Sequence, residues 1–188
     1  MTDLMNISRN ERVLTLEMNR PEKKNALTHA MYAAMADAIR DAQTDSKTGA
    51  VLICAAGDFF TAGNDLADFQ SGMPSGKPPV IHFLEAIRDA EKPLFAAVNG
   101  PAVGIGLTML LHCDLSFAAK SATFSAPFTK VGLVPEAASS LLLPQTVGLA
   151  MANDILLTGR TITADEALSC GLISRIYEDD TLLSLIHI

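Results

Sequence analysis

The sequence contains few cysteines and no long uninterrupted apolar segment. Its three cysteines, Cys54, Cys113 and Cys170, are widely spaced and embedded in apolar segments, which indicates core residues in a reducing compartment. The apolar stretches at 94–98 and 103–111 are bounded or broken by asparagine, proline and glycine, so neither is long enough to span a bilayer. We therefore expect neither a disulfide framework nor a membrane partner.

Basic residues are also scarce. The chain has 14 Lys and Arg against 21 Asp and Glu, a net charge of −7, which argues against a nucleic-acid partner. The N-terminus lacks the basic and apolar regions of a secretory signal, so we expect a cytoplasmic protein, with peroxisomal or mitochondrial targeting left open. The 188 residues, 49% of them apolar, suffice for the core of one domain.

Common nucleotide and metal signatures are missing as well. Gly104-Ile105-Gly106 lacks the third glycine of a dinucleotide fingerprint, because Met109 stands at that position, and no phosphate-loop spacing occurs. The four histidines are scattered and have no metal-ligand spacing with the cysteines or carboxylates. The sequence therefore predicts no metal site and no separate cofactor.

Apolar periodicity predicts strands that alternate with helices. A strand at 12–18 places Leu14, Leu16 and Met18 on one face, and a helix with Thr28 as its N-cap follows. The segment 70–79, rich in Gly, Pro and Ser, is typical of a surface loop. Alternating strands and helices indicate an α/β fold with a mainly parallel sheet. Further strands are expected at 50–55, 94–98, 115–118, 122–125 and 172–177, and further helices at 80–87, 104–111, 137–143, 151–157 and 163–169.

Two glycine-containing turns are the most informative feature of the chain. The turn 59–65 contains Ala62, the turn 99–106 contains Ile105, and each follows an apolar strand-like run. If the fold brings the turns together, their backbone N–H groups can both donate to one ligand oxygen. Such an oxyanion hole stabilises charge on a carbonyl oxygen, so it favours chemistry on a thioester or ester.

Around these turns the chain resembles the crotonase superfamily, also called the enoyl-CoA hydratase/isomerase family. The resemblance runs from Ile7 to Tyr177 and implies a spiral of ββα repeats that assembles as a trimer or hexamer. It also implies an acyl-CoA thioester substrate, with coenzyme A as part of the substrate rather than a cofactor. The motifs that carry the resemblance are Asn19-Arg20-Pro21, Asn25-Ala26-Leu27, Phe60-Thr61-Ala62-Gly63-Asn64-Asp65, the run from Lys92-Pro93 to Gly106, and Cys113-Asp114.

Two departures from the hydratase pattern favour an isomerase. Thr108 and Phe128 stand where hydratases carry their two glutamates, and neither can exchange a proton near neutral pH. The segment 127–136 instead resembles the Δ3,Δ2-enoyl-CoA isomerase branch, whose catalytic glutamate matches Glu136. The resemblance therefore implies that Glu136 acts as base and then acid, in an apolar surrounding that raises its pKa, while Ala62 and Ile105 N–H groups hold the thioester oxygen.

The resemblance also assigns residues to the substrate path. Arg20, Lys23 and Lys24 are candidates for contact with the phosphates of coenzyme A. Apart from this path, Asp65 is interpreted mainly as the cap of the following element, with catalysis as the alternative, and Asp114 is interpreted as structural. The residues expected to line the acyl-CoA site are Ala62, Gly63, Asn64, Asp65, Leu66, Gly104, Phe128 and Leu133.

Alternatives to the isomerase remain open at this point. Glu136 follows Pro135 and has a second interpretation as a first-turn helix carboxylate. A noncatalytic module that binds acyl-CoA or acyl-lysine would retain the pocket, and another crotonase enzyme could use the same hole for a different CoA enolate. We expect a crotonase-like core at 1–177 and an interrupted, non-native tail at 178–188, without the C-terminal helices of the family.

Overall fold

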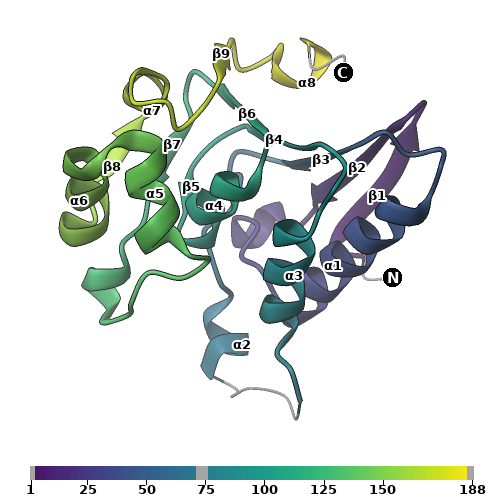
Figure 1. Ribbon diagram of the computed structural model, residues 1–188, viewed down its shortest axis with the longest axis horizontal. Helices are drawn as coiled ribbons and strands as arrows, with labels where there is room; N and C mark the ends of the chain where they lie inside the picture. Colours follow the sequence, from purple (N-terminus) through teal and green to yellow (C-terminus); the bar gives the residue numbers. More distant parts are fainter. Residues whose placement is uncertain (1–2, 71–75, 186–188) are drawn as a thin grey trace.

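A six-stranded sheet forms the centre of the protein (Figure 1). The computed structural model describes residues 3–70 and 76–185. The strand order is β1-β2-β3-β4-β6-β9, and all neighbours are parallel except the antiparallel pair β1 and β2. This arrangement confirms an α/β fold with a mainly parallel sheet. The strands are β1 (Met5–Asn10), β2 (Val13–Met18), β3 (Ala50–Ala55), β4 (Leu94–Val98), β6 (Leu115–Ala119) and β9 (Arg175–Tyr177).

A second, three-stranded sheet continues two of these strands. It consists of β5 (Ala102–Val103), β7 (Thr123–Ser125) and β8 (Thr161–Thr163), in that order. The chain passes from β4 to β5 through one turn and from β6 to β7 through another. The small sheet therefore fixes the chain directly after β4, which is where the second glycine-containing turn lies.

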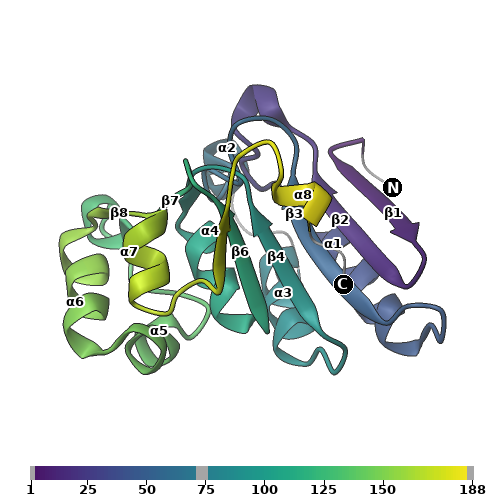
Figure 2. The same ribbon diagram turned by 90° about the horizontal axis from the view of Figure 1, so that it is seen from above.

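Helices α1 (His29–Thr44) and α3 (Pro79–Arg88) cover one face of the large sheet (Figure 2). The expected cap is present, since Thr28 Oγ1 accepts from the Met31 N–H at 3.2 Å. The opposite face carries α8 (Leu182–Leu185), whose Leu182 is buried in a smaller cluster that includes Leu52 and Phe117. Both faces of the parallel strands are apolar for this reason, as in other α/β sheets.

The remaining helices gather beside the small sheet, apart from α2 (Leu66–Gln70). Pro144 does not end α5, contrary to the prediction: the helix continues to Val147. The proline removes one N–H from the ladder, and the carbonyl that loses its partner belongs to the exposed Ser140, so water can satisfy it. The further elements are α4 (Ile105–Thr108), α5 (Ser139–Val147), α6 (Leu149–Thr158), α7 (Ala164–Ser169) and the 3₁₀ turns Pro21–Lys23, Met109–His112 and Phe128–Val131.

Some predicted segments fall outside the described residues. Positions 71–75 of the expected loop and positions 186–188 of the expected tail are among them. The described ends of that loop belong to α2 and α3. Within residues 3–70 and 76–185, none of the helices combines the length and apolar character needed to cross a membrane.

Candidate active site

The two glycine-containing turns lie in direct contact, as the sequence predicts. The Thr61 N–H donates to the Pro101 carbonyl at 3.1 Å, and the Val103 N–H donates to the Thr61 carbonyl at 3.0 Å. A Cβ added to Gly106 would lie 2.6 Å from Thr61 Cγ2, so only glycine fits at this position without a shift. The fold therefore joins segments that are about forty residues apart into one loop cluster.

Ala62 does not present its N–H to this cluster. That N–H donates to the Lys24 carbonyl at 2.9 Å, so the expectation that Ala62 supplies an oxyanion donor is wrong in this structure. Successive N–H groups of an extended chain point to opposite sides. Because Thr61 hydrogen-bonds to the second turn, its neighbour Ala62 faces the other way.

Asn64 carries the free N–H that sequence reasoning missed. The Leu27 N–H donates to the Gly63 carbonyl at 2.8 Å, and the Asp65 N–H donates to the Leu27 carbonyl at 2.9 Å. In such a parallel bridge the N–H of the middle residue, Asn64, points away from Leu27. Among the described residues, no acceptor for the Asn64 N–H is found. The register of the bridge to Leu27, rather than any local sequence pattern, identifies Asn64 in place of Ala62.

The second turn presents Ile105 at the start of α4. Gly104 precedes it with φ +58°, a conformation that favours glycine, and the Gly104 N–H donates to the Ser125 carbonyl at 2.8 Å. The first N–H groups of a helix have no partner within it. In the described part of the chain, nothing accepts from the Ile105 N–H, so this expected donor remains available to a ligand.

Glu136 is held by the same helix. Thr108 Oγ1 donates to Glu136 Oε1 at 2.5 Å. Burial raises the pKa of the Glu136 carboxyl, and the bond from Thr108 offsets part of that effect. The direction agrees with the expectation of an apolar surrounding. Thr108 follows Ile105 by three residues, about 4.5 Å along the helix axis. The helix α4 therefore carries the free Ile105 amide at its start and holds the Glu136 carboxylate at its end.

The turn that carries Glu136 adopts an unusual backbone. Ala137 and Ala138 have φ of +51° and +54°, values that are unfavourable for residues with a Cβ. The Ser139 N–H and hydroxyl both donate to the Glu136 carbonyl, at 2.9 and 2.6 Å. His112 Nε2 lies 2.9 Å from the Ala137 carbonyl oxygen. These contacts hold the strained turn and aim the carboxylate at α4.

Asp65 and Arg20 serve the structure of the first turn. Arg20 Nη1 lies 2.6 Å from Asp65 Oδ2 and also donates to the Ala26 carbonyl at 3.0 Å. Asp65 Oδ1 accepts from the N–H groups of Ala67 and Asp68, which begin α2. The hydrogen bond from Arg20 is the main cause of the lowered Asp65 pKa. Asp65 is thus a cap, and Arg20 is engaged with Asp65 and the Ala26 carbonyl.

The other expected substrate-site residues differ in exposure. Phe128 is buried, whereas Leu133 and Leu66 are exposed, at 44% and 74%. Gly63, with φ +96°, lies against the Val103 carbonyl, where a Cβ would come within 3.2 Å. Lys23 and Lys24 are exposed. Asp114 is structural as expected, because its Oδ2 accepts from the Leu94 N–H at 2.8 Å.

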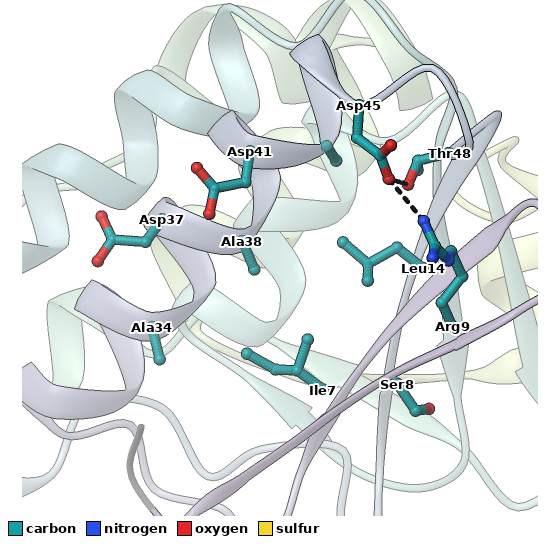
Figure 3. A pocket seen from close by; sticks show the side chains of 11 residues that line it. Ile7, Ser8, Arg9, Leu14, Ala34, Asp37, Ala38, Asp41, Asp45 and Thr48 are labelled. Carbon is teal, nitrogen blue, oxygen red and sulfur yellow. Dashed lines mark hydrogen bonds and ion pairs between the residues drawn. The ribbon is translucent and has the colours of Figure 1, made fainter.

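A cavity of about 530 Å³ lies elsewhere, between the β1–β2 hairpin and α1 (Figure 3). Ile7, Leu14 and Ala38 contribute apolar walls, while Asp37 and Asp41 stand at its edge. None of the predicted site residues lines it. Within the ranges 3–70 and 76–185, no group of three or more His, Cys, Asp or Glu gathers in a way that could hold a metal ion.

Comparisons with known proteins agree with this arrangement. The model of the family described as enoyl-CoA hydratase/isomerase matches residues 8–186. Among solved structures, an enoyl-CoA hydratase/isomerase from Pseudoalteromonas atlantica T6c is 59% identical with a TM-score of 0.94, covering 97% of this chain and 73% of that one. The likeness in fold therefore extends over nearly the whole chain.

Curated relatives span more than one activity. Enoyl-CoA delta isomerase 2 from Rattus norvegicus is 40% identical over 176 residues, covering 90% of this chain and 45% of the relative. The 2,3-dehydroadipyl-CoA hydratase from Escherichia coli is 35% identical over 188 residues, covering 97% and 72%. The chain spans about half the length of the first of these relatives.

Proposed function

Because this chain belongs to the enoyl-CoA hydratase/isomerase family, the crotonase superfamily, we propose that it is an enoyl-CoA delta isomerase. The reaction would move a double bond from C3–C4 to C2–C3 of an acyl-CoA thioester in unsaturated fatty acid degradation. The observation that carries the proposal is the carboxylate of Glu136, held by Thr108 next to a turn with a free amide. Similarity to the rat isomerase supports the same assignment.

The N–H groups of Asn64 and Ile105 would hold the thioester oxygen. Asn64 replaces Ala62 in this role, because the Ala62 N–H is bonded to Lys24. Two preorganised donors stabilise the negative charge that grows on this oxygen when a proton leaves C2. Loss of one such donor typically costs about 2.7 to 4 kcal/mol of transition-state stabilisation.

Glu136 would transfer the proton alone. Its ionised carboxylate removes a proton from C2, the electrons delocalise into a dienolate, and the protonated carboxyl returns the proton at C4. Burial raises the pKa of Glu136 toward the range that suits a base at neutral pH. Atoms and charge balance without a cofactor, because the proton and the double bond stay within the substrate.

Thr108 argues against a hydratase that relies on two glutamates. Its hydroxyl binds the carboxylate of Glu136 rather than acting as a second proton-transfer group. Water addition would need one group to activate water and another to deliver a proton. Among the residues that the structure describes, Glu136 is the carboxylate that Thr108 binds, so isomerisation by a single acid and base fits these residues better.

We also propose which residues bind the phosphates of coenzyme A. Lys23 and Lys24 are exposed near the first turn, and Lys24 contacts that turn through its carbonyl, so both suit the coenzyme A phosphates.

A trimer or hexamer is proposed from the family. Exposed leucines on the outer helices support burial against another surface, namely Leu141, Leu149, Leu157 and Leu168.

Conversion of a 3-enoyl-CoA to its 2-enoyl isomer tests the proposal directly. The product is conjugated, so ultraviolet absorbance follows the reaction. Isomerisation that depends on Glu136 supports the assignment. Binding of acyl-CoA or of an acyl-lysine peptide without turnover would indicate a noncatalytic module instead. Turnover of a different CoA thioester without isomerisation would indicate another crotonase enzyme.

A further inference from the structure

Tyr32 is a buried tyrosine whose hydroxyl reaches the candidate active site. The residue belongs to α1 and is 2% exposed, and its ring packs at 5.5 Å against Phe83 of α3. Tyr32 Oη donates to Asn64 Oδ1 at 2.5 Å. A long-range contact thus connects the main helix of the core with the residue that carries the free N–H of the first turn.

The surroundings of Tyr32 keep its hydroxyl protonated. Burial is the main cause that raises the Tyr32 pKa, and the negative charge of Glu136 raises it further. The phenol therefore stays a hydrogen-bond donor to Asn64. Tyr32 and Asn64 are thus joined by a direct bond at the first turn.

Apart from the bond to Tyr32, the backbone–backbone hydrogen bonds beside Asn64 go to Leu27. The bridge to Leu27 fixes the neighbouring backbone groups of Gly63 and Asp65, while the side chain of Asn64 is exposed. Its bond to Tyr32 is the only side-chain bond of Asn64 found in the described part of the chain. Loss of this bond would free the side chain and loosen the backbone orientation at Asn64.

We propose that Tyr32 is a positioning residue for the oxyanion hole, acting through the Asn64 side chain to aim the Asn64 N–H at the thioester oxygen. The inference rests on the proposed function, since it assumes that this N–H meets that oxygen. Misplacement of a catalytic group by about 1 Å can cost about 100-fold in rate. Since Leu27 still holds the backbone, a smaller loss is expected from removal of the hydroxyl.

Substitution Tyr32→Phe removes the hydroxyl and keeps the ring against Phe83. The matched control is Tyr177→Phe, which removes the other phenol of the chain while its ring remains near Phe117, 6.0 Å away on the opposite face of the sheet. We expect Tyr32→Phe to lower kcat about tenfold with little change in KM. Tyr177→Phe should leave both unchanged, and thermal unfolding of both variants checks their folding.

A spectroscopic measurement tests the hole without turnover. Bound acetoacetyl-CoA gains enolate absorbance when donors stabilise charge on its thioester oxygen, so the absorbance reports the strength of the hole. We expect clear enolate absorbance for the unsubstituted chain and for Tyr177→Phe, and severalfold less for Tyr32→Phe at saturation. Equal absorbance in Tyr32→Phe and the unsubstituted chain would overturn the inference.

A double-mutant cycle shows whether Tyr32 acts through Asn64. In an Asn64→Ala background, which keeps the backbone N–H, Tyr32→Phe should have no further effect on the enolate signal. Full additivity of the two effects would contradict the inference. A chain that forms the Tyr32-dependent enolate but does not isomerise 3-enoyl-CoA would overturn the proposed function alone. Absence of the signal from the unsubstituted chain would overturn both.

Discussion

The hydroxyl of Thr108 donates a hydrogen bond to the Glu136 carboxylate at 2.5 Å, across 28 residues of sequence. Thr108 ends the helix that Ile105 begins, so one short element supports both the candidate base and a candidate oxyanion donor.

Substitution Glu136→Gln should strongly reduce isomerisation while acyl-CoA binding persists. Glutamine has nearly the same shape and can still accept from Thr108, but it cannot remove a proton from C2. We expect kcat to fall by about 10² to 10⁴. Steady-state assay with a 3-enoyl-CoA measures kcat, and calorimetric titration with a saturated acyl-CoA measures binding. The exposed Glu91→Gln serves as a matched control, and turnover of Glu136→Gln at the unsubstituted rate would remove Glu136 from the mechanism.

Substitution Thr108→Val should move the acidic limb of the kcat profile to higher pH. The bond from Thr108 lowers the Glu136 pKa, so its loss leaves burial as the dominant cause and raises that pKa. Glu136 must be ionised to take a proton, and a higher pKa means that activity falls at a higher pH. Measurement of kcat from pH 4 to 9 shows the pH at which activity falls on the acidic side. Thr146→Val, which removes an exposed hydroxyl on α5, should leave it in place.

Substitution Ile105→Pro should weaken the oxyanion hole. Proline is tolerated at the first position of a helix, and it removes the free N–H of Ile105. We expect a loss of about 10² to 10³ in kcat. The control Ile105→Val trims the side chain and keeps the N–H. If the two variants lose the same activity at comparable thermal stability, the side chain rather than the amide is responsible.

Substitution Asp65→Asn should destabilise the fold at neutral pH. Asp65 has a lowered pKa in the folded protein, so its ion pair with Arg20 contributes stability above the unfolded value near 3.8. We expect a loss of about 2 kcal/mol at pH 7. The difference should shrink as pH falls through the folded pKa, because protonation then breaks the pair in the unsubstituted protein too. Urea unfolding at pH 7 and pH 3 measures both values.

The surface pair of Arg88 and Asp89 provides the comparison for that experiment. Both side chains are 62% exposed, so water and salt screen the pair. Asp89→Asn should produce no measurable change in the urea midpoint at pH 7. A loss in Asp89→Asn equal to that in Asp65→Asn would show that the partly buried position of Asp65 is not what makes its pair important.

Local patterns predict most of the fold because they report local physics. The continuous apolar run 50–55 becomes β3 without a change of boundary, and Thr28 caps α1 as its hydroxyl and position indicate. The sequence does not predict strand β1, since its residues after the buried Met5 have intermediate or high exposure and show little apolar alternation. Its position at the sheet edge explains this, because pairing with β2 rather than burial holds it.

The site shows where sequence patterns reach their limit. Glycine spacing locates both turns, but it does not show which N–H of the first turn is free. That depends on partners distant in sequence, namely Lys24 for Ala62 and Leu27 for the residues that flank Asn64. The Tyr32 bond to Asn64 is likewise a product of tertiary packing, since α1 reaches the turn only in the folded chain.

The segment 105–112 sets the separation between the Ile105 N–H and the Glu136 carboxylate. Ile105, Thr108 and His112 follow one another at spacings of three and four. Ile105 supplies a free amide, Thr108 binds the Glu136 carboxylate, and His112 contacts the Ala137 carbonyl in the turn that carries Glu136. The rise of the helix from Ile105 to Thr108 therefore determines how far the Ile105 N–H lies from the Glu136 carboxylate. Under the proposed function, a substrate of any chain length would bring its C2 to Glu136 and its thioester oxygen to the Ile105 N–H, so differences in chain length would be absorbed at the far end of the acyl group.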